Sequence, residues 1–175
     1  MVIAAAVIVF AVYGVSVYNK IISGDEGVTA GWSEVVNQYQ RRADLIPNLI
    51  STVEGFAAQE KDVLMSVVEA RAKATAAPVS PDTVNNPEAL SKFSQAQAAL
   101  GGALSRLLVT VERYPDIKSG KNFLELQTQL EGTENRISVA RNRYITAVKS
   151  FNTNVRKFPG SMIAKHFGFS TKANF

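Results

Sequence analysis

The chain has 175 residues, with 19 lysines and arginines against 15 aspartates and glutamates, one histidine and no cysteine. This length predicts one domain with a real core, and the missing cysteines exclude disulfides, thiolate metal sites and cysteine nucleophiles. A single histidine excludes zinc hydrolases that need two or three histidine ligands, and a net charge of +4 is too small to indicate nucleic-acid binding.

The first predicted element is a transmembrane anchor over residues 1–23. Residues 2–18 carry no charge, and as a helix they reach roughly 26 Å at about 1.5 Å per residue. The next few residues, with Lys20 snorkelling, bring the helix close to the roughly 30 Å apolar thickness of a bilayer. A secretory signal peptide is the alternative, but no basic residue precedes the apolar run and no small-residue cleavage site follows it. We expect a single-pass protein of the cell membrane, and Lys20, Arg41 and Arg42 favour a cytoplasmic bundle.

Residues 24–158 predict a bundle of long helices, because their apolar side chains recur at steps of three, four or seven residues. Prolines mark three breaks, at residues 77–87, 114–116 and 158–160. Pro47 falls inside the first apolar stripe, which stays in phase on both sides, so we expect a kink or a short break there. The predicted fold class is all-α, with the N-terminal transmembrane helix followed by an elongated antiparallel bundle of three to four long helices.

Two local patterns make finer predictions within this bundle. Asn85 or Asn86, placed before Pro87, predicts a helix N-cap followed by proline at the first helical position. Gly101 and Gly102 lie inside a helical stripe, and we interpret the pair as a site of close helix packing rather than as a ligand-binding loop.

No catalytic motif stands out along the chain. Glu60 and Glu134 lie near the apolar stripes of the first and last long helices, where two buried acids would form a metal or acid–base site. The di-metal pattern of helical bundles needs Glu-x-x-His twice, whereas the one histidine, His166, lies in the tail. We favour the alternative that the two acids are salt-bridged or exposed. The chain is therefore predicted not to be an enzyme and to bind no cofactor.

The most unusual run covers residues 41–50, where two arginines, an acid and an asparagine surround a helix-breaking proline. Pro47 removes a backbone donor and frees the carbonyl of Ala43, one turn earlier. The Asn48 amide or an arginine would satisfy this carbonyl and fix the kink; a partner-binding role is the alternative. The candidate residues are Arg41, Arg42, Asp44, Pro47 and Asn48.

With this run the chain resembles the LemA family. The matching segments are Trp32 and residues 39–49, then residues 69–71, 100–107, 112–118, 122–127, 133–137, 140–141, 144, 158–159, 163–165 and 167–169. They follow in order from the anchor to Phe169. The resemblance implies a bacterial membrane protein with one N-terminal span and a long antiparallel helical bundle, in a family that has no agreed biochemical activity. Residues 24–27 depart from the family, which often carries several arginines just after the membrane.

The tail over residues 159–175 is basic and aromatic. No acidic residue follows Glu134, whereas eight basic residues do, and residues 25–134 carry 10 basic and 15 acidic side chains. Basic and aromatic side chains on a short helix are typical of an interfacial membrane contact. The alternative is that Ile163, Phe167 and Phe169 fold back to cap the bundle. The candidate membrane-surface residues are Phe158, Ile163, Lys165, Phe167 and Phe169.

Together these observations predict a non-enzymatic bacterial membrane protein that acts as a self-associating structural or scaffolding component at the membrane. An acidic middle and a basic last helix would let neighbouring copies pair, so we expect the lipid bilayer and a homo-oligomer as partners, and no nucleic acid. The alternative is a membrane-anchored adaptor that recruits a protein partner through the Arg41–Asn48 region.

Overall fold

The computed structural model describes residues 2–56 and 58–175, and the side chains of residues 2–7 and 10 lie outside this description. The described residues form helices and no strand, as the apolar spacing predicts. In chain order the elements are α1 (Val2–Thr52), η1 (Glu54–Phe56), α2 (Lys61–Ala76), η2 (Pro81–Asn85), α3 (Pro87–Val111), α4 (Pro115–Lys118), α5 (Lys121–Arg156) and α6 (Gly160–Phe167).

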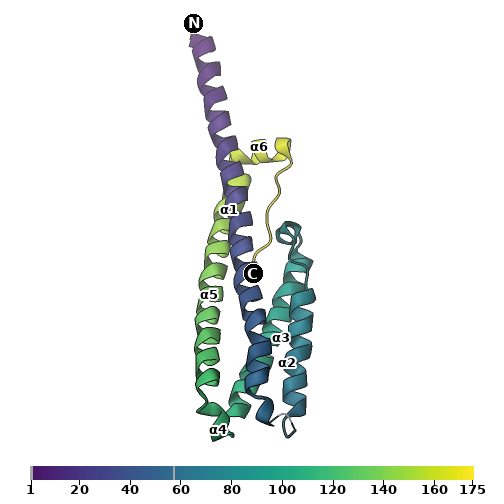
Figure 1. Ribbon diagram of the computed structural model, residues 1–175. Helices are drawn as coiled ribbons and strands as arrows, with labels where there is room; N and C mark the ends of the chain where they lie inside the picture. Colours follow the sequence, from purple (N-terminus) through teal and green to yellow (C-terminus); the bar gives the residue numbers. More distant parts are fainter. Residues whose placement is uncertain (1, 57) are drawn as a thin grey trace.

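Four long helices, α1, α2, α3 and α5, run alternately down and up an elongated bundle (Figure 1). The central helix is α1, which packs mainly against α5 on one side, while the α2–α3 hairpin lies on the other side. The N-terminal part of α1 projects beyond the bundle, and the short α6 lies across its base (Figure 1). The molecule therefore has a narrow projecting end and a broad end formed by the interhelical turns.

The core consists of two apolar clusters stacked along the bundle. The cluster nearer the projecting end is aromatic, with Trp32, Phe93, Tyr144 and Phe151 almost completely buried. The second cluster is mainly aliphatic and lies toward the turns, where α1, α2 and α3 contribute most of its side chains. The predicted apolar stripes thus face the helix interfaces.

Helix boundaries on either side of α3 follow the sequence signals. The Asn86 side chain accepts hydrogen bonds from the amides of Glu88 and Ala89 at 3.0 and 3.1 Å, with Pro87 at the first helical position. This confirms the predicted N-cap, which satisfies two backbone donors that the helix itself leaves free. The proline-marked breaks before α3, between α3 and α5, and between α5 and α6 are also confirmed.

The position of the first turn differs from the prediction. The helix α1 continues through Pro47, and the chain turns between the end of α1 at Thr52 and the start of α2 at Lys61, so of the predicted kink or short break at Pro47 the break is wrong. The Ala43 carbonyl accepts a hydrogen bond at 2.9 Å from Nε of Arg71 on α2. An arginine therefore satisfies this carbonyl, as the sequence suggested, and it comes from the neighbouring helix. The apolar stripe stays in phase across the real turn, which concealed it.

The glycine pair also has a different role from the predicted one. A side chain at Gly102 would meet nothing within 4 Å, and one at Gly101 would meet only an Arg42 nitrogen, at 3.8 Å. The interpretation as close helix packing is therefore wrong. Close packing occurs instead between α1 and α5, where a Cβ on Gly31 would lie 3.3 Å from the Cα of Tyr144.

The predicted transmembrane anchor over residues 1–23 is not supported by the described residues. Among them, no helix is both long enough and apolar enough to cross a membrane. Residue 1 and the side chains of residues 2–7 and 10, on which part of this prediction falls, lie outside the description.

Candidate functional site

A buried arginine joins three helices in the middle of the bundle. Arg42 is only 3% exposed. One of its terminal nitrogens (Nη1) donates to Glu134 Oε2 on α5 at 3.0 Å, and the other (Nη2) donates to the backbone carbonyl and to Oε1 of Gln97 on α3, both at 2.9 Å. Its guanidinium carbon lies 5.0 Å from the centre of the Tyr39 ring. Such charge-assisted bonds fix the relative positions of α1, α3 and α5.

The same layer extends to the fourth long helix. Gln97 Nε2 donates to the backbone carbonyl of Ala74 on α2 at 3.3 Å, and Arg71 of α2 bonds the Ala43 carbonyl of α1. Polar contacts therefore connect all four long helices at one level. Since buried polar groups are stable only when they are paired, this layer favours one relative register of the helices over shifted alternatives.

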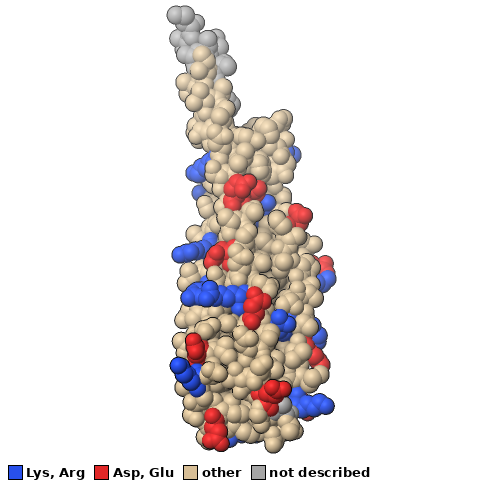
Figure 2. Space-filling view, in the orientation of Figure 1, with Lys and Arg blue, Asp and Glu red and all other residues tan. Residues whose placement is uncertain are grey.

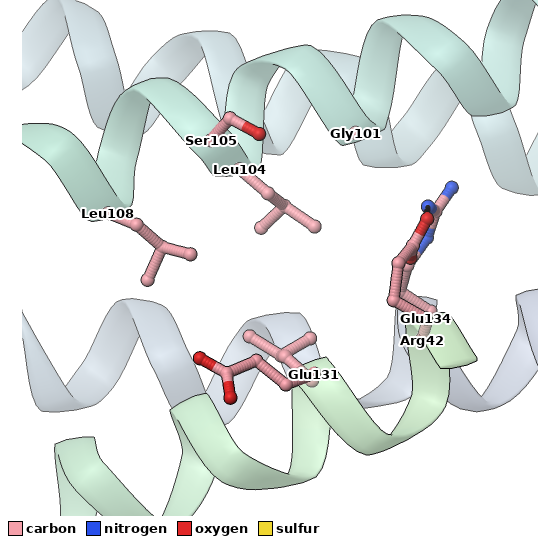
Figure 3. Close-up of a pocket in the computed structure, with 8 residues that line it drawn as sticks. Arg42, Gly101, Leu104, Ser105, Leu108, Glu131 and Glu134 are labelled. Atoms are coloured by element: carbon pink, nitrogen blue, oxygen red, sulfur yellow. Dashed lines mark hydrogen bonds and ion pairs between the residues drawn. The ribbon is translucent and has the colours of Figure 1, made fainter. Parts of the chain in front are cut away.

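The Arg42–Glu134 pair lies at one end of a groove between α3 and α5 (Figure 3). The groove has a volume of about 340 Å³. Leucines from both helices line it, together with Gly101, Ser105 and Glu131. The arginine already bonds protein acceptors, so the groove presents mainly apolar walls. The lining leucines are Leu104, Leu108 and Leu130.

The other residues of the predicted motif lie on the surface of α1. Arg41, Asp44, Pro47 and Asn48 are all exposed, and the Asp44 carboxylate accepts a hydrogen bond from Gln40 at 2.8 Å. The structure therefore divides the motif. Arg42 belongs to the interior, whereas the other four residues share an outer face that is open to contact.

The C-terminal tail folds back along the bundle as a strap. Phe175 lies among aromatic side chains, with its ring centre 6.2 Å from that of Trp32 and 5.5 Å from that of Tyr144. The Tyr144 hydroxyl donates to the carbonyl of Ala173 at 2.7 Å, and the amide of Ala173 donates to the carbonyl of Val84 at 2.7 Å. Burial raises the pKa of Tyr144 to about 12, so its hydroxyl stays protonated and donating at neutral pH.

The predicted membrane-surface residues divide into two groups. Ile163 and Phe169 pack against the core, as the capping alternative describes. Phe158 and Phe167 remain 76% and 55% exposed, and Lys165 is exposed beside them. The ring of Phe167 also contacts Tyr18, with a centre-to-centre distance of 4.5 Å, which joins α6 to the base of the projecting end.

The projecting end exposes further apolar side chains. In Figure 2 its described part carries neither blue nor red side chains, and charged residues begin near the level of α6. Single exposed apolar residues are normal on proteins, but a continuous apolar end next to an apolar helix face marks a contact surface. The large apolar side chains exposed here are Ile8, Val9, Val12, Tyr13, Val15, Phe158, Met162 and Phe167.

A comparison with known protein families identifies the family of this chain. The model described as "LemA family" matches residues 31–175, which include all of α2, α3, α5 and α6. The chain belongs to the LemA family. The resemblance seen in the sequence is thereby confirmed.

Similar proteins are found among curated magnetosome proteins. This LemA-family chain is 27% identical over 174 residues to both "Magnetosome protein MamQ 1" and "Magnetosome protein MamQ 2" of Paramagnetospirillum magneticum, which covers 90% of the chain. It is 25% identical over 168 residues to "Magnetosome protein MamQ" of Magnetospirillum gryphiswaldense, which covers 87% of the chain. The chain spans 62–64% of the length of these relatives.

Glu60 and Glu134, the two acids that would form a metal or acid–base site, do not pair with each other in this LemA-family bundle. Glu60 accepts bonds from Arg113 at 2.8 Å and from the Tyr114 hydroxyl at 3.1 Å, near the turns. Glu134 pairs with Arg42 in the polar layer. Burial, followed by the hydrogen bond to Glu60, raises the pKa of Tyr114. Each acid therefore has its own arginine, which agrees with the salt-bridged alternative. Within the described residues, no three potential metal ligands cluster.

Gln97 is the main residue of the polar layer that sequence reasoning missed. A signal was present, because the apolar stripe of α3 skips one step between Phe93 and Leu100, where Gln97 lies. The stripe of α1 skips a step between Tyr39 and Ile46, where Arg42 lies. Gaps at the same level of neighbouring helices indicate a shared polar layer, but only the packing shows which gaps face each other.

Proposed function

We propose that this LemA-family protein is a membrane-associated structural component whose bundle stands on a bilayer by its α6 end and associates with further copies. The observation that carries the proposal is the apolar end formed by the projecting part of α1 and the exposed apolar side chains at and beside α6. The magnetosome relatives support a role at a membrane-bounded structure. From the sequence we predict that the bundle lies on the cytoplasmic side of the membrane.

The geometry of α6 supports this contact with lipid. The helix lies across the base of the projecting end (Figure 1), and its inner side is fixed by Ala164, which is buried, and by Ile163. Met162 and Phe167 remain exposed, with Lys165 nearby, and the Phe167 ring also contacts Tyr18 of α1. A short helix held crosswise, with exposed apolar side chains and a lysine, is suited to lie in the plane of a membrane interface.

The first test replaces three exposed apolar side chains at and beside α6 together, as Phe158→Ser, Met162→Ser and Phe167→Ser. We expect the partition of the full chain onto phosphatidylcholine vesicles to fall by about tenfold. The variant loses the favourable free energy of moving three large apolar side chains from water into the bilayer. Flotation of protein with vesicles measures this partition. The matched control replaces Met65, Val109 and Leu124, which are exposed on the sides of the bundle, by serine. Equal partition of the two variants would contradict the proposal.

The outer face of α5 supports association with a second copy. A shallow hollow of about 530 Å³ lies along this helix, and it combines the half-exposed Val139 with the small residues Thr146, Ala147 and Ser150. Such a face admits close approach of another helix. On the face shown in Figure 2, acidic and basic side chains are interspersed, so a neighbour would meet alternating charges there rather than two opposite blocks.

The second test adds a second positive charge to this hollow, which Arg143 already lines, by Val139→Arg. We expect chemical cross-linking of the full chain on vesicles to lose its dimer and higher bands, because the arginine would be desolvated between two helices. The stability of the monomer should change by no more than about 0.5 kcal/mol, since the site is exposed. Val109→Arg, at an exposed valine on α3, is the control. Unchanged cross-linking in both variants would refute association through α5.

The adaptor alternative rests on the outer face of α1. Asn48 lines a groove of about 280 Å³ with polar side chains of α5, among them Asn122, Glu125 and Gln129, and Arg41 is exposed on the same helix. A protein partner would bind there through hydrogen bonds and charge. This role predicts that Arg41→Ala abolishes capture of the partner and leaves the bundle folded.

A further inference from the structure

A basic pocket lies beside α6, on the last three turns of α5. It has a volume of about 530 Å³, and its walls come from α5 and from the tail. Ile145, Lys149, Asn152 and Arg156 follow one another at steps of four, three and four residues, which places them on one face of the helix. Lys157 closes the upper edge, and the tail supplies the remaining wall at residue 174.

The tail wall is held in place by hydrogen bonds. The Asn152 amide donates to the backbone carbonyl of Lys172 at 3.0 Å, while its oxygen accepts from the Lys172 amide at 2.8 Å. The Lys172 side chain pairs with Asp25 at 2.7 Å and points away from the pocket cations toward α1. The pocket is therefore a fixed feature of the folded chain and does not depend on a loop that must close.

The charges of the pocket lack acidic partners. Lys149, Arg156 and Lys157 are exposed, and within the described part of the chain none of the three forms an ion pair. No acidic residue follows Glu134 in the sequence. Two ammonium groups and one guanidinium group line one hollow, which is a donor set suited to phosphate oxygens. The Thr153 hydroxyl in the same wall donates to the Lys149 carbonyl at 2.7 Å.

The pocket also lies at a suitable depth. The headgroup layer adds roughly 5 to 7 Å to each side of the apolar bilayer core. Residues 149–157 extend about 12 Å along α5, at about 1.5 Å per residue, and their upper end is separated from α6 by only Phe158 and Pro159. With α6 in the interface, Arg156 and Lys157 reach the phosphate level. Lys149 starts about 10 Å further from the membrane along α5 and lines the same hollow.

We propose that this pocket binds the phosphate group of an anionic phospholipid headgroup, in the membrane on which α6 rests. The inference deepens the proposed function and depends on it for the orientation of the bundle. The same cations also complement the carbonyl end of α5, but that role predicts a loss of helix stability and no preference among lipids.

The experiment compares flotation of the full chain on phosphatidylcholine vesicles and on vesicles that also contain phosphatidylglycerol. The pocket variant is Lys149→Gln, Arg156→Gln and Lys157→Gln. Its matched control removes the same charges elsewhere, as Lys73→Gln, Lys121→Gln and Arg136→Gln, at exposed positions. We expect the preference for phosphatidylglycerol to fall by about tenfold in the pocket variant and much less in the control. Equal preference in the two variants would overturn the inference, and denaturant unfolding verifies that both are folded.

Two further measurements are needed. The first distinguishes failure of the pocket from failure of the apolar contact at α6, and the second distinguishes a lipid phosphate from a free phosphate. Binding to pure phosphatidylcholine should be unchanged in the pocket variant and lowered by the serine substitutions on the α6 face. If those substitutions have no effect while the pocket variant still loses its preference, the proposed apolar contact fails and the pocket stands. Excess glycerol 3-phosphate at constant ionic strength should leave the preference intact. If it abolishes the preference, the pocket binds a free phosphate and the assignment to lipid is overturned.

Discussion

Replacement of Arg42 by alanine is expected to lower the free energy of unfolding by about 3 to 5 kcal/mol. The loss arises mainly at Gln97, whose buried carbonyl and side-chain oxygen each lose a charged donor at 2.9 Å. The Glu134 side chain is 61% exposed, so its carboxylate returns to water at little cost. The cavity left by the arginine adds a further penalty. Urea denaturation of the full chain, followed by circular dichroism, measures the change.

Arg41 provides the matched control, since it precedes Arg42 directly and is exposed on the same helix. Arg41→Ala should change stability by no more than about 0.5 kcal/mol. Similar effects of the two substitutions would show that the polar layer does not stabilise the bundle. The pair also separates the two proposals for this motif, because a partner that binds the outer face of α1 would be lost with Arg41→Ala in a fully stable protein.

Gly160→Ala is expected to displace α6 and to lower the free energy of unfolding by about 2 to 3 kcal/mol. A Cβ at this position would lie 2.1 Å from the backbone carbonyl oxygen of Asn154. Rotation of a side chain cannot relieve this contact, because the carbonyl is part of the backbone and the backbone fixes the position of the Cβ. The helix must therefore move away from α5, which exposes Ala164. Denaturation measures the stability, and hydrogen exchange of the α6 amides shows where protection is lost.

Gly132→Ala is the control for this substitution. Gly132 lies within α5, and a Cβ there would meet nothing within 4 Å. Alanine should stabilise the helix by roughly 0.5 to 1 kcal/mol, because glycine loses more backbone entropy on folding. The two substitutions are chemically identical and opposite in expected sign. A neutral or stabilising Gly160→Ala would show that α6 is not held closely against α5, and the proposed membrane contact would lose its rigid support.

Local signals in the sequence were sufficient where the cause is local. The Asn86 cap and the proline-marked ends of α3 and α5 follow from hydrogen bonds and steric limits within a few residues, so they appear at the predicted places. The turn at residues 53–60 was missed because it contains no proline, and because a turn of suitable length keeps the apolar stripe in phase. The spacing of apolar residues shows which face of a helix is buried, but it does not show where the chain reverses its direction.

The sequence by itself determined that this LemA-family chain forms long amphipathic helices, where most of them end, and which side chains face the core. Only the tertiary structure decided that Arg42 is buried while Arg41 is exposed, that Gln97 completes the polar layer, and that the tail forms one wall of a basic pocket. The physical reason is the range of the interactions. Caps and stripes depend on neighbours one turn away, whereas these contacts join residues 20 or more positions apart, whose meeting depends on how whole helices rotate and pack.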